Sequence, residues 1–187
     1  ELDGMRFGSD LIIDNDVYYV AADTKIFKIN LNTHEIISSV ICEGVRNLAV
    51  VGNKLFATRG EYLVSFDSYL HIFNTDDLSL ELALDNQLGP KWATQNIIPI
   101  GNKVYFAINN AYEFGNEKGI IGIYDSQNSV YEEIDLGPEA KNPDNLVKSG
   151  DFLYTVNNKD WSGASISKLA IDLSENETVN IATASTG

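Results

Sequence analysis

Cysteine and histidine are almost absent from this sequence. Its 187 residues include one cysteine, Cys42, and two histidines, His34 and His71. A single cysteine excludes an internal disulfide, and the simplest reading of Cys42 is a small buried apolar side chain in a strand. The histidines fall in different sequence units, and nothing brings them together. We therefore expect no histidine-based catalytic pair and no metal site.

Positive charge and long apolar runs are also scarce. There are 13 lysines and arginines against 27 acidic residues, which gives a formal net charge of −14. Such a surface repels phosphate, so neither nucleic acid nor an anionic membrane surface is an expected partner. No apolar run approaches the roughly 20 residues that span a bilayer, so no membrane span is predicted. The opening "ELDGMRFGSD" lacks a signal peptide, and we expect a processed chain rather than a full precursor.

A repeat dominates what is present. The stretches "NLAVVGNKLFA", "NIIPIGNKVYF" and "NLVKSGDFLYT" begin at Asn47, Asn96 and Asn145, so successive copies start 49 residues apart. Each copy has an apolar run, a Gly-Asn or Gly-Asp pair, and alternating residues that end in an aromatic. Because such pairs accept positive φ, each copy is predicted to open with a β-hairpin. A weaker copy, "DLIIDNDVYYV", precedes the three.

Two further strands follow each hairpin. The third ends in an apolar residue and a short acid or amide that bonds its own backbone and starts a turn; these pairs are Ile29-Asn30, Phe73-Asn74, Tyr124-Asp125 and Ile171-Asp172. Pro99 is the one proline inside an apparent strand, which predicts an edge strand or a bulge there. Helical periodicity is absent. The chain divides into four units of four strands, at 1–42, 43–88, 89–139 and 140–187.

Units of this length with four antiparallel strands are typical of the blades of a β-propeller. One four-stranded sheet cannot bury both of its faces, and neighbouring blades cover them. A repetitive β-sandwich or a solenoid is the alternative. A closed four-bladed ring of the haemopexin type is stapled by a disulfide, which one cysteine cannot supply. The predicted fold is therefore an all-β propeller with about four blades present, forming part of a larger ring.

The hairpins ending in "VYFAINN" and "LYTVNN" resemble the YVTN-type surface-layer β-propellers. The stretches "GIIGIYDSQNSVYEEIDLG" and "KNPDNLVKSGDFLYTVNNKDWSGASISKL" are similar to a Bacteroidetes branch of cell-surface propellers, many of them lipoproteins of unknown function. The resemblance implies a ring of seven or eight blades, export to the cell surface or periplasm, and no enzymatic activity. Some such relatives capture nutrients beside outer-membrane transporters. The N-terminal region of this sequence has no lipid-anchor cysteine.

Propeller topology predicts one face for recognition. Loops between second and third strands (58–69, 109–119 and 157–165) and loops between blades (42–46, 87–94 and 137–143) emerge on the same side. Exposed aromatics with polar neighbours suit a sugar, a corrinoid or a protein, although each aromatic can also simply pack its own loop. The candidate ligand-binding residues are Arg59, Tyr62, Trp92, Asn109, Asn110, Tyr112, Asn158, Lys159 and Trp161.

The expected function is non-enzymatic binding or scaffolding through this loop face. The ligand would be a small molecule, a glycan or a protein partner such as an outer-membrane transporter, with no cofactor. One alternative is a propeller glycosidase or lyase, because Glu61, Glu113, Glu117 and Asp160 lie on the same predicted loops. Another is a purely structural surface-layer component. A calcium loop at Asp14-Asn15-Asp16 is not expected, because the required glycine and bidentate glutamate do not follow.

Overall fold

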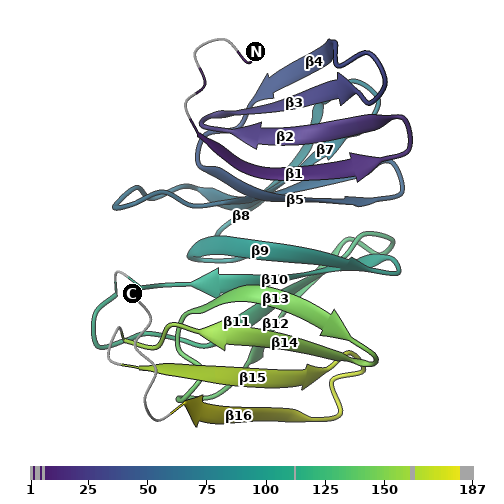
Figure 1. Ribbon diagram of the computed structural model, residues 1–187. Coiled ribbons are helices and arrows are strands. Elements are labelled where there is room, and N and C mark those ends of the chain that lie inside the picture. Colours follow the sequence, from purple (N-terminus) through teal and green to yellow (C-terminus); the bar gives the residue numbers. More distant parts are fainter. Residues whose placement is uncertain (1, 3–4, 6, 112, 161–162, 182–187) are drawn as a thin grey trace.

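The computed structural model describes residues 2, 5, 7–111, 113–160 and 163–181, and these residues form an all-β fold. Their regular structure consists of sixteen strands, with no helix among the described residues. The strands form four separate sheets of four, each antiparallel and each taken in order along the chain. Figure 1 shows the sheets stacked one after another in chain order. The predicted fold class is confirmed.

The four sheets are called blades 1 to 4. Blade 1 contains β1 (Gly8–Asp14), β2 (Val17–Ala22), β3 (Lys25–Asn30) and β4 (Ile36–Ile41). Blade 2 contains β5 (Val45–Val51), β6 (Lys54–Arg59), β7 (Ser68–Asn74) and β8 (Leu80–Asp85). Blade 3 contains β9 (Ala93–Ile100), β10 (Lys103–Asn109), β11 (Ile120–Asp125) and β12 (Val130–Asp135). Blade 4 contains β13 (Pro143–Ser149), β14 (Phe152–Asn157), β15 (Ala164–Ala170) and β16 (Asn176–Ile181).

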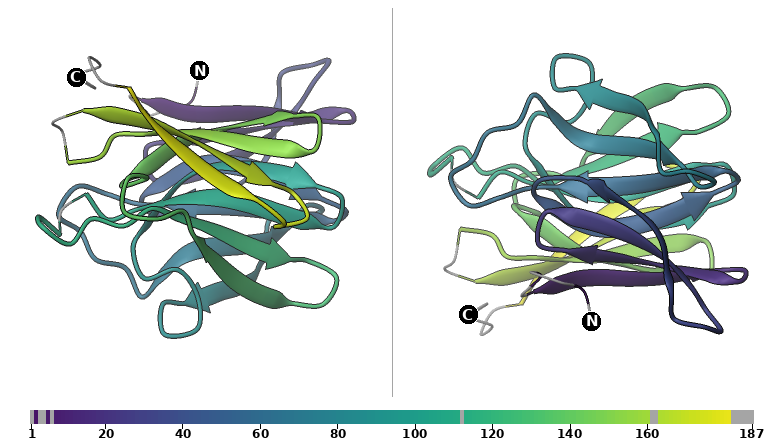
Figure 2. Two further views of the ribbon diagram at one scale, coloured as in Figure 1. Left: turned by 90° about the horizontal axis from the view of Figure 1, so that it is seen from below. Right: turned by 90° about the horizontal axis from the view of Figure 1, so that it is seen from above.

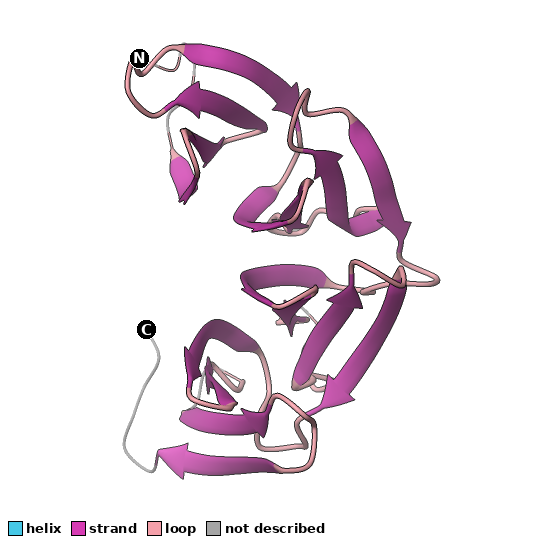
Figure 3. Ribbon diagram, turned by 90° about the vertical axis from the view of Figure 1, so that its right-hand side faces the viewer, coloured by secondary structure: helices cyan, strands magenta, loops and turns pink. Residues whose placement is uncertain are grey.

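The blades are arranged around an arc. The first strands of consecutive blades contact one another, β1 with β5, β5 with β9 and β9 with β13, so they form the inner side. The fourth strands form the outer rim. Figure 3 shows the four sheets following one another around an arc that does not close on itself.

The turns have the backbone geometry that the repeated pairs predict. Gly52, Gly101 and Gly150 have φ between 57° and 60°, and Asn15 takes the same place in the weaker first copy with φ 51°. At the ends of the third strands, Asn30, Asn74, Asp125 and Asp172 each accept backbone N–H bonds at 2.8–3.0 Å from residues two or three positions on. One boundary differs: β15 ends at Ala170, two residues before the expected Asp172, because the turn back to β16 begins there with a bond from the Ala170 N–H to the Glu175 carbonyl.

The repeated asparagines mark a bulge in each inner strand. The pairing of the first strand with the second shifts register around Asn47, Asn96 and Asn145, and around Ser9 in blade 1. A bulge increases the local twist and redirects side chains. Pro99, as expected, lies in a strand at the edge of its sheet, with its side chain exposed. The three asparagines therefore occupy the same position in the inner strands of their blades, where Asn47 and Asn96 are half-buried and Asn145 is exposed.

At two junctions the side chain at the position of the repeated asparagines bonds to the next blade. In blade 1 this position is Asp10. Asp10 Oδ2 accepts a hydrogen bond of 2.7 Å from the backbone N–H of Leu48, and Asn96 Oδ1 accepts one of 3.0 Å from that of Leu146. Leu48 and Leu146 are themselves buried. In each case an inner-strand N–H is bonded by a side chain of the preceding blade. This repeat position therefore connects blade 1 to blade 2 and blade 3 to blade 4.

We expect Asn96→Ala to lower the free energy of unfolding by about 1–2 kcal/mol, because it leaves the N–H of buried Leu146 without its acceptor. Asn145→Ala is the matched control: it changes the same repeat position in blade 4, where the residue is exposed, and should stay within about 0.5 kcal/mol. Urea denaturation of both variants measures the difference. Equal losses in the two would contradict the assigned connection.

Apolar side chains fill the space between consecutive blades. One cluster, built around Tyr19, Leu55 and Phe73, lies between blades 1 and 2. A second, around Phe56 and Phe106, lies between blades 2 and 3. A third, around Tyr105 and Leu153, lies between blades 3 and 4. Blades 2 and 3 bury both faces against their neighbours, and blades 1 and 4 each bury one face in this way.

Candidate functional site

The long connections gather on one side of the arc. The loops 60–67, 110–119 and 158–163 join second to third strands, and they bond to the loops between blades. Asn86 donates to the Asp67 carbonyl at 2.8 Å, Leu136 to Gly119 at 2.7 Å, and Lys159 to Lys141 at 2.9 Å, all through backbone N–H groups. Figure 2 shows these connections on one side and the short hairpin turns on the other. This side is called the loop face.

A pocket of about 240 Å³ opens on the loop face between blades 2 and 3. Its walls come from the loop 60–67, the segment before β9, and the loop after β10. The lining residues are Glu61, Leu63, Val64, Ser65, Tyr69, Trp92, Ala93, Asn109, Asn110 and Glu113. Three of the candidate residues from the sequence, Trp92, Asn109 and Asn110, are therefore brought together. We call this cavity the loop-face pocket.

The indole of Trp92 is held in place within this pocket. Trp92 is half-buried and packs against the apolar cluster between blades 2 and 3. Its ring N–H donates to Glu113 Oε1. The other Glu113 oxygen accepts a bond of 3.0 Å from Asn116 Nδ2, and the Glu113 N–H donates to the Asn110 carbonyl at 2.8 Å. A flat apolar surface and a carboxylate are thus fixed side by side.

The two asparagines contribute differently. Asn110 is buried. Its Nδ2 donates to the Asn116 carbonyl at 2.9 Å, and its Oδ1 accepts a bond of 2.7 Å from the Lys118 N–H, so both bonds hold the loop after β10 in place. Asn109 is half-buried, and its Oδ1 accepts a bond of 2.8 Å from the Ala111 N–H. The Asn109 amide group remains on the pocket wall as a potential donor. Asn110 thus holds the loop, whereas Asn109 presents its amide group to the loop-face pocket.

Several large apolar side chains stand exposed around the loop-face pocket. Tyr62, Leu63 and Val64 have exposed fractions between 46% and 72%. Leu63 has φ 55°, a left-handed conformation that leucine rarely adopts, within a tight loop closed by a bridge between Glu61 and Val64. Exposed apolar groups and an uncommon backbone conformation are features that cluster at binding sites.

The remaining candidates lie elsewhere. Lys159 sits between blades 3 and 4, where its ammonium bonds Glu139 Oε2 and Asn180 Oδ1, each at 3.0 Å. The neighbouring Asn158 donates its backbone N–H to the Asn142 carbonyl at 3.0 Å. Neither residue lines the loop-face pocket. Tyr112 and Trp161 lie outside the described residues.

Arg59 lies in the protein interior, below the loop 60–67. Its guanidinium donates to the Glu43 carbonyl at 2.9 Å, to the Ser68 carbonyl at 2.5 Å and to His71 Nε2 at 2.9 Å. It also lies 4.2 Å from the centre of the Phe66 ring. These contacts give Arg59 an internal role, in which it anchors the base of the loop 60–67.

The proton positions of His71 follow from this contact. Because a guanidinium only donates hydrogen bonds, His71 Nε2 must accept, and its Nδ1 carries the proton that faces Cys42 Sγ at 3.9 Å. Burial and the positive charge of Arg59 lower the pKa of His71 to about 4. Burial raises the pKa of the Cys42 thiol to about 11. Cys42 is buried as expected, although just after β4, and neither group is prepared for nucleophilic chemistry.

His71 gives a predictable pH dependence. Between about pH 6.5 and pH 4 the unfolded chain takes up a proton at His71 that the folded chain does not, so stability falls as the pH falls through this window. His71→Gln retains an acceptor for Arg59 and should lose less stability between pH 7 and pH 5 than the wild type. His34→Gln, at an exposed histidine, should keep the wild-type change. Urea denaturation midpoints at pH 7 and pH 5 measure the change in stability. A His71→Gln variant that loses as much stability as the wild type between these pH values would contradict the lowered pKa of His71.

The four acidic residues considered for catalysis separate into two groups. Glu61 and Glu113 line the loop-face pocket. Glu117 and Asp160 instead flank Lys141, whose ammonium lies 3.8 Å from a carboxylate oxygen of each. A hydrogen bond from the Gly115 N–H lowers the pKa of Glu117, and Lys141 adds to this effect. Only the first pair faces a cavity together.

Other site residues were not singled out from the sequence. Leu63, Val64 and Ser65 belong to a loop that was expected on this face but whose individual side chains carried no signal. Tyr69 and Ala93 lie in strands, where the sequence predicts packing. No group of three or more metal-ligating side chains occurs among the described residues. In the same part of the chain, no helix has the length and apolar character needed to cross a bilayer.

Comparisons with known proteins place the fold. No family model and no curated protein matches the sequence. Hydrazine synthase from Kuenenia stuttgartiensis is similar in structure with a TM-score of 0.69 and 16% identity, over 96% of this chain and 53% of that one. The extracellular domain of a putative one-component system from B. thetaiotaomicron has a TM-score of 0.67 and 14% identity, over 92% and 22%. The N-terminal domain of Nup159 has a TM-score of 0.56 and 9% identity, over 95% and 44%.

These similarities, together with the four radial sheets, define the chain as a β-propeller. It spans about half of the hydrazine synthase chain and about a fifth of the B. thetaiotaomicron chain. At such low identities the likeness concerns the fold alone. Function therefore has to be argued from the residues of the loop face.

Proposed function

We propose that this propeller is a non-enzymatic binding module that recognises a glycan, or a similarly hydroxylated small molecule, in the loop-face pocket. The observation that carries the proposal is the fixed indole of Trp92 beside the Glu113 carboxylate. A sugar ring has an apolar face that stacks on indole and a hydroxylated edge that donates hydrogen bonds to carboxylates. A concave site with one aromatic surface and a few oriented polar groups suits such a ligand.

The charge of the loop-face pocket supports the choice of ligand. Its lining includes the carboxylates of Glu61 and Glu113 and the amide of Asn109, and the lining residues include no lysine or arginine. An anionic ligand would be repelled by the two glutamates and by the net charge of −14. A neutral polyhydroxylated ligand matches a lining that combines hydrogen-bond acceptors with apolar side chains.

Export to the cell surface or periplasm, beside an outer-membrane uptake system, belongs to the same proposal. Two observations support it: the resemblance of the repeats to YVTN-type surface-layer propellers, and the similarity in fold to an extracellular domain from B. thetaiotaomicron. An acidic surface with exposed aromatic groups suits a protein that meets neutral nutrients outside the cell.

Glycan binding is tested by screening the protein against an array of neutral oligosaccharides and measuring the best ligand by calorimetry. Trp92→Ala should weaken binding at least tenfold, and Glu113→Gln, which keeps the side-chain shape, should weaken it less. Phe114→Ala is the control, because this exposed residue does not line the loop-face pocket. Binding that survives Trp92→Ala unchanged would refute the site.

A glycosidase or lyase is the second candidate, because Glu61 and Glu113 line one cavity and glycoside hydrolysis uses a pair of carboxyl groups. Incubation with a polysaccharide panel separates the two functions. Products that disappear in both Glu61→Gln and Glu113→Gln would establish the enzyme. Binding without turnover would establish the binding module.

A further inference from the structure

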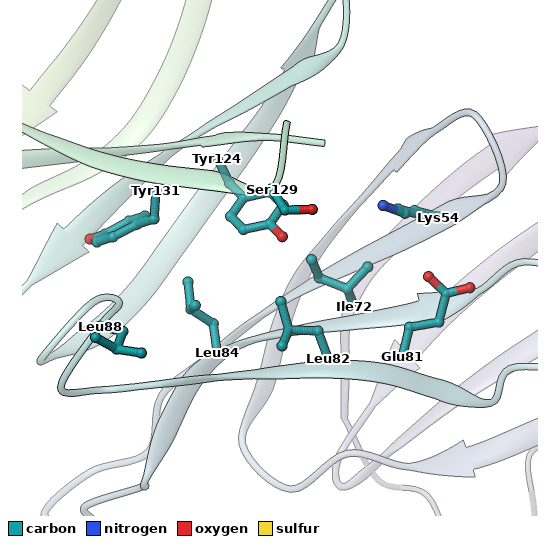
Figure 4. A pocket seen from close by; sticks show the side chains of 9 residues that line it. All are labelled: Lys54, Ile72, Glu81, Leu82, Leu84, Leu88, Tyr124, Ser129 and Tyr131. Carbon is teal, nitrogen blue, oxygen red and sulfur yellow. The ribbon is translucent and has the colours of Figure 1, made fainter. Parts of the chain in front are cut away.

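A second pocket lies at the outer rim, away from the loop-face pocket. It is a groove of about 520 Å³ between blades 2 and 3, and Figure 4 shows its side chains. Blade 2 and the loop after it supply an aliphatic wall of Ile72, Leu82, Leu84 and Leu88, and blade 3 supplies the rings of Tyr124 and Tyr131. Lys54 and Glu81 lie together at one end of the groove in Figure 4. We call this cavity the rim groove.

The repeat shows why the groove is open at this junction. Strand pairing aligns Leu82 of blade 2 with Glu132 of blade 3, since each is opposite an isoleucine of the third strand, Ile72 or Ile123. In blade 3, Glu132 forms an ion pair with Lys103 at 3.7 Å. Blade 2 has the equivalent lysine, Lys54, but a leucine in place of the acid. Lys54 Nζ instead reaches across the junction to the Ser126 carbonyl at 3.2 Å.

A second difference concerns the facing blade. At the junction of blades 3 and 4, Asn176 Nδ2 bonds the Asp135 carbonyl at 3.2 Å and brings the outer strands together. Strand pairing aligns Tyr131 of blade 3 with Asn176 of blade 4. Tyr131 does not cross to blade 2 in this way: its ring stacks on Phe106 in its own blade, and its hydroxyl donates to Glu133 Oε1 at 2.5 Å. The rim between β8 and β12 therefore stays apart.

The acid at the polar end is placed by a bulge. The pairing of β7 with β8 shifts register between Ile72 and Phe73, opposite Glu81. Bulges redirect a side chain, and this one brings Glu81 to the same face as Leu82. One Glu81 oxygen accepts a bond of 2.9 Å from Asn74 Nδ2, which fixes the carboxylate at the groove end. A cation and an anion thus stand at one end of a groove whose other end is apolar.

We propose that the rim groove binds an α-amino acid with a large apolar side chain. Such a molecule carries its carboxylate and its ammonium group next to each other, and these match Lys54 and Glu81. Its side chain lies along the groove between the leucines and the tyrosine rings. Charge-assisted hydrogen bonds at one end set the orientation, and burial of the apolar side chain adds affinity. A molecule with a single charge leaves one of the two groups unmatched.

The experiment uses L-phenylalanine and two analogues that each lack one charged group: phenethylamine, without the carboxylate, and 3-phenylpropionate, without the ammonium group. Binding is followed by amide chemical shifts in NMR titrations. Phenylalanine should bind about tenfold more tightly than either analogue, because each analogue gives up one charge-assisted contact. Failure of phenylalanine to bind, or equal affinities for the three, overturns the proposal.

Variants assign the contacts. Lys54→Gln should weaken phenylalanine about tenfold and leave phenethylamine unchanged, and Glu81→Gln should weaken phenylalanine and leave 3-phenylpropionate unchanged. Lys103→Gln, at the equivalent position of blade 3, is the matched control and should bind as the wild type does. Leu82→Glu recreates the blade 3 ion pair beside Lys54 and should abolish binding while the protein stays folded. Wild-type affinity in Lys54→Gln or in Leu82→Glu refutes the assignment.

Discussion

Replacement of Phe106 by alanine is expected to lower the free energy of unfolding by about 3–5 kcal/mol. The side chain is fully buried between blades 2 and 3. Directly opposite it in the sheet is Gly122, where a Cβ would lie 2.3 Å from the ring, and Tyr131 stacks on the ring with a centroid distance of 6.1 Å. The phenyl ring fills the space left by Gly122 and Tyr131, so Phe106→Ala leaves a cavity that neighbouring groups cannot refill.

Urea denaturation at neutral pH measures the loss, with Phe114→Ala as control. Phe114 is 78% exposed, and its removal should change the free energy of unfolding by less than about 0.5 kcal/mol. A Phe106→Ala variant that loses less than about 1 kcal/mol would show that blades 2 and 3 do not pack on this ring.

Arg59→Ala is the second substitution with a large expected effect, a loss of about 2–4 kcal/mol. It removes the donor to the carbonyls of Glu43 and Ser68 and to His71 Nε2, and it leaves these acceptors, of which the Ser68 carbonyl is buried, without that partner. Arg59→Lys should recover only part of the loss, because one ammonium group cannot reproduce the planar fork of donors. Lys91→Ala, at an exposed position near the loop face, is the control.

The same variant tests which role Arg59 has. The sequence suggested a ligand contact, whereas its position suggests an anchor for the loop 60–67. If Arg59 anchors the loop, Arg59→Ala lowers the free energy of unfolding, and glycan binding weakens only because the loop 60–67 is held less firmly. Normal stability with lost binding would instead identify Arg59 as a ligand-facing residue.

The repeat made the fold predictable from the sequence. Gly-Asn and Gly-Asp pairs specify backbone angles, and Asn30, Asn74, Asp125 and Asp172 specify the turns after the third strands, so local chemistry alone predicts most of the strands. The role of Asn96 was not accessible in this way. Its partner, Leu146, lies in another blade, and the contact depends on how the blades pack.

The candidate site was only partly predictable, for a related reason. Topology predicts which loops share a face, and this was enough to identify Trp92 and Asn109 as candidates for one site. It does not predict where each side chain points. Arg59 is at the end of a strand next to a loop, and only its three internal acceptors show that it turns inward. The rim groove was missed altogether, because it arises from differences between blades rather than from any motif.

Hydrogen–deuterium exchange with and without the best glycan ligand tests most directly whether recognition belongs to the loop face. The account predicts ligand-dependent protection in the loop 60–67, around Trp92 and in residues 109–117, with little change in the hairpin turns on the opposite side. Protection confined to those turns, or to the outer strands β8 and β12, would contradict it.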